Sequence, residues 1–372
     1  MRHDWTAADF AHGPMMFYYE TTLACDLECR HCRASAQKNP APDELTTAQA
    51  MRLIDHVASF PRPPHLVFTG GDPLKRADLF ELIRHAVSQR RLEVALTPSA
   101  TPLATRDALE RARDAGVSAL GVSLDAADAA THDAFRRLDG SFARTWELLH
   151  WARELGMPVQ VNTTVSRRNV TQIDAMAERL ADAGIAMWSL FLLIPVGRGT
   201  LEERIEPAAY EELFAKIHAH AICQPYAIKT CEAPHYRRWV LQHGDAQNIG
   251  AQNTSGENVN ASGVKPMRRA PLGVGDGKGV MFVSHRGEIL PAGFLPVVCG
   301  RFPEDSVVET YQNHPVFRAL RDPDRFTGRC GVCEYRYICG GSRSRAFALT
   351  GDYTATDHDC IWTPNPDCPP IR

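Results

Sequence analysis

The sequence predicts an α/β protein: a partial (β/α)6 barrel of the TIM type, followed by a small cysteine-rich C-terminal domain. Short apolar segments alternate with longer helical patterns as far as about residue 225, where this pattern stops. The apolar segments are nearly continuous hydrophobic runs, which is typical of parallel strands buried on both faces. Six strand–helix units are too few to close an eight-stranded barrel, so we expect an open one.

Six strands and five long helices are expected in this first part of the chain. The strands are residues 16–21, 65–69, 93–97, 119–124, 159–165 and 188–194. The helices are residues 47–59, 78–89, 106–115, 142–155 and 172–183. Gly116, Gly156 and Gly184 follow three of these helices, and glycine commonly ends helices at this position.

The chain is expected to divide into four segments: an N-terminal extension (1–14), the barrel (15–225), a linker or insertion (226–279) and the cysteine-rich domain (280–372). Residues 242–279 are rich in Gly, Asn, Gln and Ser, which indicates a long loop. Residues 280–284 and 288–290 predict a β-hairpin that turns at Arg286 and Gly287. The tail beyond has little periodicity, and small irregular modules of this kind usually need a metal to fold.

Composition excludes several classes of partner. The 372 residues are 44% hydrophobic and carry a formal net charge of −3, so we expect neither nucleic-acid nor membrane-surface binding. The sequence contains no apolar run of about 18 residues and no signal-peptide pattern, which predicts a cytoplasmic protein. Thiols stay reduced there, so eleven clustered cysteines favour metal sites over disulfides.

Three cysteines, Cys25, Cys29 and Cys32, directly follow the first expected strand. Three thiolates on one short loop suit a [4Fe–4S] cluster and leave one iron free to bind a small molecule. The alternative is a structural zinc site with His31 as fourth ligand. His31 is adjacent to Cys32 and would compete with it for one tetrahedron, and zinc sites prefer CxxC pairs to the CxxxCxxC spacing found here.

This CxxxCxxC motif, placed after the first strand of a partial barrel, resembles that of the radical S-adenosylmethionine superfamily. The resemblance implies that Cys25, Cys29 and Cys32 hold a [4Fe–4S] cluster whose open iron binds the amino and carboxylate groups of S-adenosylmethionine. It also implies reductive cleavage of this cofactor to a 5′-deoxyadenosyl radical, which abstracts hydrogen from a substrate. An electron donor such as a flavodoxin or ferredoxin is then expected. Family members usually carry an aromatic residue where this chain has His31.

Further cofactor-binding residues are expected at the ends of the strands. Gly70, Gly71 and Asp72 end the second strand, where glycines allow close approach of backbone to a ligand. In the family, the matching Gly-Gly-Glu segment hydrogen-bonds the methionyl amine of the cofactor. A plain βα turn is the alternative interpretation.

The fourth, fifth and sixth strands add other candidates. The resemblance places Ser123 or Asp125, or both, near the ribose or carboxylate of the cofactor, although Asp125 equally suits a helix N-cap. Asn162 is expected to face the barrel interior, and Pro195 lies in a segment that packs the adenine in the family. Parallel α/β folds bind ligands at the carboxyl ends of their strands, where all these residues fall.

A second group of cysteines, Cys330, Cys333, Cys339 and Cys360, lies in the tail. Four thiolates make a closed site for an iron–sulfur cluster or, as the alternative, for zinc. The spacing resembles the SPASM extension of radical S-adenosylmethionine enzymes, which implies auxiliary clusters that relay electrons or fold the tail. Ala292 stands where a two-cluster SPASM domain has a further cysteine, so we expect one auxiliary [4Fe–4S] cluster. Cys299 remains an alternative ligand.

The segments 232–238, 291–296 and 339–343 resemble a narrower group of haem d1 biosynthesis proteins and alternative haem synthases. The resemblance implies oxidative decarboxylation or removal of tetrapyrrole propionate side chains. Arginines are candidate partners of such carboxylates, although at least two of them are expected in structural ion pairs or on the surface. These candidates are Arg237, Arg238, Arg343 and Arg345, with His235 as an orienting group.

Two other functions remain open. One is a maturase that modifies a ribosomally made peptide. Because the segment before the first strand is short, we expect no leader-binding domain in it, and a separate protein would then recognise the leader. The other is a non-catalytic iron–sulfur electron carrier or a zinc scaffold. An electron carrier would not need the Gly-Gly-Asp segment at a strand end or a cluster with an open iron.

Overall fold

Ten strands form one sheet in the computed structural model, which describes residues 5–6, 8–244 and 273–371. Strands β1 to β7 are all parallel and follow the chain order, and β8 pairs in parallel with the other edge of β1. Strands β9 and β10 extend this edge in antiparallel orientation. The strands are β1 (Met16–Glu20), β2 (His65–Thr69), β3 (Val94–Leu96), β4 (Val117–Ser123), β5 (Val159–Val165), β6 (Met187–Leu192), β7 (Ala227–Cys231), β8 (Val280–Val283), β9 (Glu288–Leu290) and β10 (Gly300–Arg301).

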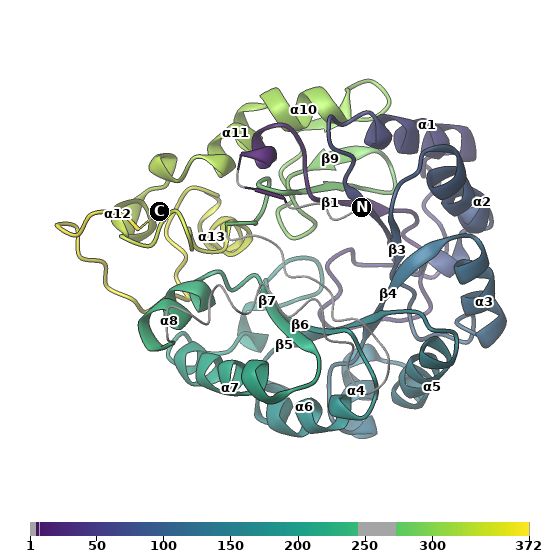
Figure 1. Cartoon of the computed structure of the whole chain (residues 1–372), viewed down its shortest axis with the longest axis horizontal. Helices are drawn as coiled ribbons and strands as arrows, with labels where there is room; N and C mark the ends of the chain where they lie inside the picture. Colours follow the sequence, from purple (N-terminus) through teal and green to yellow (C-terminus); the bar gives the residue numbers. More distant parts are fainter. Residues whose placement is uncertain (1–4, 7, 245–272, 372) are drawn as a thin grey trace.

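Helices surround the curved sheet on its outer side, and the C-terminal segments occupy the part of the ring that they leave open (Figure 1). The barrel helices are α1 (Thr47–Ala58), α2 (Leu79–Arg84), α3 (Arg106–Asp114), α4 (Ala129–Arg136), α5 (Ser141–Glu154), α6 (Ile173–Ala181), α7 (Ala209–Cys223) and α8 (His235–His243). The C-terminal helices are α10 (Val307–Asn313), α11 (Pro315–Arg321), α12 (Gly328–Val332) and α13 (Arg343–Thr350).

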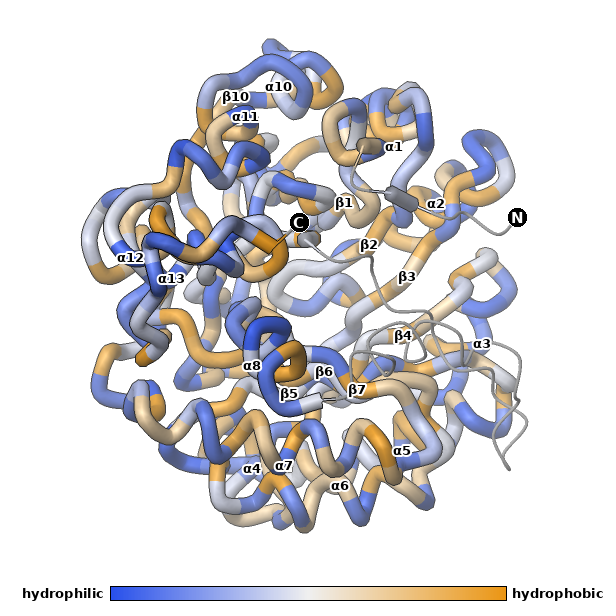
Figure 2. Tube along the Cα trace, turned by 60° about the vertical axis from the view of Figure 1, so that its left-hand side comes forward, coloured by the Kyte–Doolittle hydropathy of each residue, from blue (hydrophilic) through white to orange (hydrophobic). Residues whose placement is uncertain are grey.

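Local signals in the sequence explain where the helices begin. Thr46 and Gln49 form a capping box at the start of α1, which satisfies backbone N–H groups that the helix leaves without partners. Thr105 and Asp128 are simple N-caps of α3 and α4, where each side chain accepts one backbone N–H of the first turn. Hydrophobic and hydrophilic residues alternate along α4 to α7, consistent with helices that bury one face against the sheet (Figure 2).

The fold class predicted from the sequence is confirmed, and all six expected strands and the expected hairpin are present. Four elements of the barrel were not among those expected: α4, α7, β7 and α8. The expected helix 78–89 is α2 followed by a wider turn of π-helix at His85–Gln89. Most of the loop expected at 242–279 lies outside the described residues. The expected boundary at residue 280 falls between β7 and β8, which belong to the same sheet.

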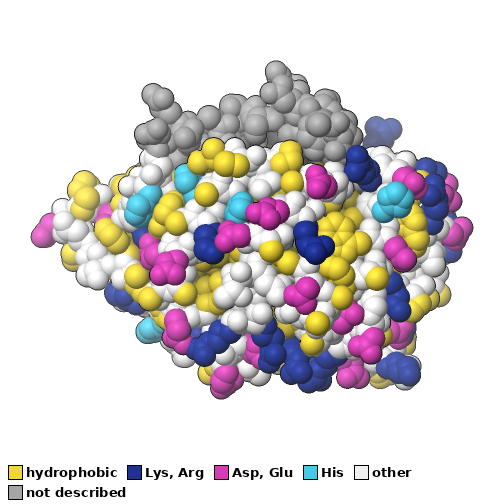
Figure 3. Space-filling view, turned by 90° about the horizontal axis from the view of Figure 1, so that it is seen from below, with side chains coloured by type: hydrophobic (Ala, Val, Ile, Leu, Met, Phe, Trp, Pro, Cys, Tyr) yellow, Lys and Arg dark blue, Asp and Glu magenta, His cyan; other side chains and the backbone are white. Residues whose placement is uncertain are grey.

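Charged groups are mixed on the surface. On the face shown in Figure 3, basic and acidic side chains are interspersed and neither sign dominates. Among the described residues, no helix is both long enough and apolar enough to cross a membrane.

Candidate active site

A cavity of about 570 Å³ opens inside the barrel, where the carboxyl ends of the strands meet the C-terminal tail. Residues from both ends of the chain line it, so barrel and tail together form its walls. Parallel strands present backbone and side-chain groups at their carboxyl ends, which is why ligands bind there.

All three cysteines of the first group line this cavity. Cys25 and Cys29 are buried and Cys32 is half-buried. Burial raises the pKa of the Cys25 thiol to about 11 and also raises that of Cys29, because charged thiolates are disfavoured away from water. A bound metal reverses this balance, since coordination deprotonates thiols.

Hydrogen-bond donors are directed at these sulfurs. The backbone N–H of Leu27 donates to Cys25 Sγ at 3.3 Å and that of Ala36 donates to Cys32 Sγ at 3.4 Å. The Arg136 guanidinium lies 3.6 Å from Cys29 Sγ. Such donors stabilise cluster sulfurs and tune their potential, so the residues present fit an iron–sulfur cluster. In the described part of the chain, no three His, Cys, Asp or Glu side chains converge closely enough for a single metal ion.

Two glycine segments hold the cysteine loop in place. A Cβ on Gly71 would lie 2.4 Å from the carbonyl oxygen of Ala24, and one on Gly197 would lie 2.3 Å from that of Cys32. Only glycine allows these approaches. Arg198, next to Gly197, donates to the carbonyls of Cys29 at 2.9 Å and Ala36 at 2.8 Å. The segment after β6 thus clamps the cysteine loop.

The predicted cofactor-binding residues divide into two sets. Gly70, Gly71, Ser123 and Asn162 line the cavity. Asp72, Asp125 and Pro195 lie outside its lining.

Asp72 and Asp125 have structural partners instead. Asp72 is fully buried and accepts hydrogen bonds from Thr101 Oγ1 at 2.8 Å and from the Leu74 N–H at 3.2 Å. Asp125 pairs with Arg136 and accepts from the Thr164 N–H at 2.7 Å. The alternative interpretation of Asp125 as a helix N-cap is wrong, because Asp128 caps α4.

His31 lines the cavity and stacks on Phe135 with ring centroids 4.4 Å apart. Burial lowers the pKa of His31 well below its usual value, so the imidazole is neutral. It therefore occupies the position of the family's aromatic residue with an uncharged flat ring.

The second group of cysteines lines a separate small cavity in the tail, and Cys339 lines both cavities. Backbone N–H groups donate to these sulfurs: Asp357 to Cys330 at 3.3 Å and Gly341 to Cys339 at 3.4 Å. Burial raises the pKa of Cys333 to about 12 and that of Cys339 well above its usual value. Cys299 is not in this lining; it is buried and lies 3.4 Å from the Val297 carbonyl.

Of the four arginines expected to bind carboxylates, two form ion pairs within the protein and two line the cavity. Arg238 pairs with Glu211, and Arg345 is fully buried against Asp357 at 3.0 Å. Both are therefore structural. Arg237 and Arg343 line the cavity.

His235 is also placed away from the cavity. It is fully buried between Tyr210 and Phe214, and burial lowers its pKa to about 3.

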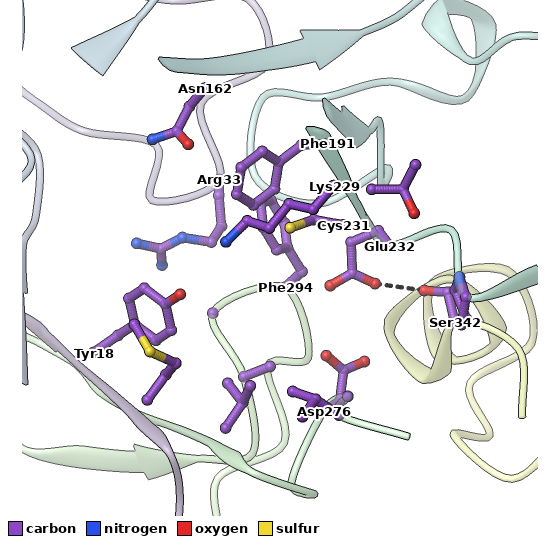
Figure 4. Close-up of a pocket in the computed structure, with 18 of the residues that line it drawn as sticks. Tyr18, Arg33, Asn162, Phe191, Lys229, Cys231, Glu232, Asp276, Phe294 and Ser342 are labelled. Atoms are coloured by element: carbon purple, nitrogen blue, oxygen red, sulfur yellow. Dashed lines mark hydrogen bonds between the residues drawn. The ribbon is translucent and has the colours of Figure 1, made fainter. Parts of the chain in front are cut away.

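The residues at the end of β7 were missed because that strand was not predicted. Lys229, Cys231 and Glu232 follow each other along one wall of the cavity (Figure 4). Glu232 accepts a hydrogen bond from Ser342 Oγ at 2.5 Å and is hydrogen-bonded to Asp276 across the cavity wall. Burial and the nearby charge of Asp276 raise the pKa of Glu232 to about 8, and burial also raises the pKa of Asp276, which favours the protonated form of these carboxyl groups.

Comparison with known proteins identifies the family. Residues 19–180 match the model of the radical SAM superfamily. The AdoMet-dependent heme synthase of Methanosarcina barkeri is 38% identical over 95% of this chain and 98% of its own length. The pre-heme d1 synthase of Dinoroseobacter shibae is 29% identical over 93% and 85%. Streptococcus suis SuiB bound to S-adenosylmethionine has the same fold, with a TM-score of 0.70, 14% identity and coverage of 94% and 78%. The chain is therefore a radical S-adenosylmethionine enzyme that carries a [4Fe–4S] cluster and uses S-adenosylmethionine.

Proposed function

We propose that this enzyme removes or oxidatively decarboxylates propionate side chains of a tetrapyrrole. The observation that carries the proposal is the charge of the cavity. Among the described residues of its lining, seven are Lys or Arg and two are Asp or Glu: Arg33, Arg136, Lys229, Arg237, Lys278, Arg336 and Arg343 against Glu232 and Asp276. The whole chain has a net charge of −3, so this excess of positive charge is local.

A cavity with this charge favours a substrate with several carboxylates. Its volume lies within the range of about 300–1,000 Å³ that is typical of pockets for ligands of this size. The two similar relatives are named for haem and haem d1 synthesis, which supports the same class of substrate. A tetrapyrrole with propionate groups carries several carboxylates and has a size suited to this cavity.

The positions of the cysteines support a role for each group. Cys25, Cys29 and Cys32 would hold the [4Fe–4S] cluster, which when bound supplies the electron that cleaves S-adenosylmethionine. Gly70, Gly71, Ser123 and Asn162 lie in the lining beside it and would contact the cofactor. A low-potential donor such as a flavodoxin or ferredoxin would reduce the cluster, and a reducing cytoplasm would keep the thiols available.

We infer further that Cys330, Cys333, Cys339 and Cys360 hold one auxiliary [4Fe–4S] cluster in a SPASM-like domain beyond residue 280. Cys339 lines both cavities, so a cluster there would border the substrate. Oxidative decarboxylation releases one electron from the substrate in addition to the abstracted hydrogen atom. A cluster in contact with the substrate cavity can accept that electron.

The test is an anaerobic assay of reconstituted, dithionite-reduced enzyme with S-adenosylmethionine, with and without iron-coproporphyrin III. Mass spectrometry follows 5′-deoxyadenosine and the mass of the porphyrin. We expect deoxyadenosine to rise with the porphyrin while the porphyrin loses carboxyl groups. Equal deoxyadenosine in both samples with an intact porphyrin would contradict the tetrapyrrole substrate and favour a peptide. The Cys29→Ala variant is the control and should form no deoxyadenosine.

The auxiliary cluster has its own test. Cys333→Ala should lower the iron content, leave basal cleavage of S-adenosylmethionine in place and abolish turnover of the porphyrin. Unchanged iron content and turnover would show that the second cluster is misassigned. Metal analysis of the wild-type protein separates this interpretation from zinc.

A further inference from the structure

The centre of β7 places a lysine in the cavity without a carboxylate partner. Lys229 pairs with Ser189 of β6 in the parallel ladder, and its side chain extends into the cavity (Figure 4). Within the described part of the chain, its ammonium group forms no hydrogen bond or ion pair. An unpaired cation that is half withdrawn from water is stabilised by an anion that binds beside it.

Three other basic residues of the lining already have acidic partners. Arg33 pairs with Glu20 at 2.9 Å, Arg136 with Asp125, and Arg336 with Asp324 at 3.1 Å. The charge of these three arginines is therefore compensated by the protein itself.

The three remaining basic residues, all near the tail, differ from Lys229 in other ways. The Arg343 guanidinium donates to the backbone carbonyls of Tyr353 at 3.1 Å and Ala355 at 2.7 Å. Both ends of the Arg237 guanidinium are used by backbone carbonyls, those of Ile338 at 3.1 Å and Val274 at 2.7 Å. Burial and the neighbouring charge of Arg237 lower the pKa of Lys278, so its protonated ammonium form is less favourable than that of an ordinary lysine. Lys229 is thus the lining cation best able to bind an incoming anion.

Two aromatic rings lie beside Lys229. Phe191 projects from β6 and Phe294 from the segment after β9, and their ring centroids are 6.1 Å apart at an angle of 46° (Figure 4). Aromatic rings offer flat apolar surface to a conjugated ligand. The acidic pair of Glu232 and Asp276 lies on the side toward Ser342, where it offers no positive charge to a carboxylate (Figure 4).

We propose that Lys229 binds a peripheral carboxylate of the substrate while Phe191 and Phe294 contact the face of its ring system. This inference rests on the proposed tetrapyrrole substrate and adds the group that orients it. Because the acidic pair lies farther along the same wall, carboxylates are directed toward Lys229 and away from the Ser342 side of the cavity.

The experiment measures binding and not turnover. Cluster-loaded wild type, Lys229→Met and Lys216→Met are titrated with iron-coproporphyrin III, and absorbance gives the dissociation constant at two salt concentrations. Methionine keeps the length of the side chain and removes its charge. Lys216 is the matched control, since it lies on α7 and pairs with Asp174 at 2.7 Å outside the cavity.

Lys229→Met should weaken binding by about 10- to 100-fold, as expected for loss of one charge-assisted hydrogen bond, and should reduce the dependence on salt. Lys216→Met should bind like wild type. Lys229→Arg retains the charge and should bind within a few-fold of wild type, which separates loss of the anion contact from a packing defect in β7.

The outcomes distinguish the two proposals. If the wild type binds the porphyrin and Lys229→Met binds it equally well, the role of Lys229 is overturned and the proposed substrate class stands. Equal weakening by Lys216→Met and Lys229→Met also overturns it, since the effect would then be general electrostatics. Failure of the wild type to bind the porphyrin overturns the proposed substrate, and the role of Lys229 with it.

Discussion

Arg136 is the side chain that connects the first cysteine site to the barrel. It ends α4, pairs with the buried Asp125 and lies 3.6 Å from Cys29 Sγ. Although burial alone would lower its pKa, the charge of Asp125 raises it, so Arg136 stays protonated. A fixed positive charge beside Cys29, a proposed cluster ligand, would favour the reduced form of the cluster, because reduction adds negative charge.

Arg136→Gln should therefore lower the midpoint potential of the first cluster, measured by a redox titration followed by electron paramagnetic resonance. It should also destabilise the protein by about 3–5 kcal/mol, because Asp125 is left as an unpaired buried charge. The double variant Arg136→Gln/Asp125→Asn should recover stability but keep the low potential. Arg153→Gln, at an exposed position of α5, is the control, and an unchanged potential in Arg136→Gln would refute this role.

The acidic pair makes stability depend on pH. Glu232 has a positive φ of 59°, an uncommon backbone conformation that its contacts with Ser342 and Asp276 hold in place. Its pKa is about 8 in the folded protein against 4.5 for an ordinary glutamate. The Glu232 carboxyl group binds its proton more tightly in the folded state than in the unfolded state. Its contribution to the unfolding free energy is therefore greatest below pH 4.5 and falls as the pH rises toward 8.

Glu232→Gln should remove this pH dependence, because glutamine resembles the protonated acid. Between pH 5 and pH 8.5 the wild type should lose on the order of 1–3 kcal/mol more unfolding free energy than the variant. Urea denaturation of cluster-loaded protein at both pH values measures the difference. Parallel loss in both proteins would show that Glu232 is ionised in the folded state.

Among the elements, the segment after β6 restrains the cysteine loop most directly. Gly197 has a φ of 62°, and a Cβ there would meet the carbonyl oxygens of both Cys32 and Arg33 at 2.3 Å. Gly156 has nearly the same φ, 66°, but no atom lies within 4 Å of its Cβ position. The two glycines share the backbone strain and differ only in crowding.

Gly156→Ala should therefore cost about 1 kcal/mol, the usual penalty for a side chain in this conformation. Gly197→Ala should cost more and also displace the cysteine loop, which lowers iron content and cleavage of S-adenosylmethionine. Thermal unfolding and iron analysis of the two variants test this pair. Equal behaviour would show that the segment after β6 does not hold the loop.

Strand β7 was not predicted because part of its sequence is polar. Its residues are Ala-Ile-Lys-Thr-Cys, and the polar Lys229 and Thr230 interrupt the hydrophobic run that identified the other strands. These side chains line the cavity, so burial does not require them to be apolar. Helix α4 is only eight residues long, and its buried residues are His132 and Phe135, so few apolar side chains mark it in the sequence. Strands that are buried on both faces were predicted correctly, because nearly all of their residues are hydrophobic.

At the scale of the whole molecule, the cysteine motifs and the order of strands and helices were predictable because both are local in sequence. The contacts that form the site are not local. Arg136 reaches Cys29 across 107 positions of the chain, and Arg198 reaches Cys29 across 169. A position at the end of a strand also does not show whether a side chain faces the cavity. Asp72 and Asp125 were therefore predicted as cofactor-binding residues together with Ser123 and Asn162, although only the latter two line the cavity.

The tail is fixed to the barrel by a buried charge network around Arg345. This residue is fully buried and pairs with Asp357 at 3.0 Å and Asp359 at 2.9 Å. It also donates to the Glu232 carbonyl at the end of β7, and Tyr210 of α7 donates to Asp359 at 2.8 Å. The charge of Arg345 outweighs the effect of burial on Asp357 and lowers its pKa to about 2. The network joins α13, β7 and α7 beside the second cysteine group.

Arg345→Met should destabilise the protein by about 3–5 kcal/mol, because it removes the buried cationic partner of Asp357 and one of the two ion-pair partners of Asp359. The effect should extend to the second cysteine group, since the Asp357 N–H donates to Cys330 Sγ at 3.3 Å, and iron content should fall with it. Arg325→Gln is the control: Arg325 forms an exposed ion pair with Asp322 at 3.2 Å, and such pairs contribute about 0–1 kcal/mol. Anaerobic urea denaturation with iron analysis measures both variants. Wild-type stability in Arg345→Met would mean that the tail is held by its apolar contacts and not by this charge network.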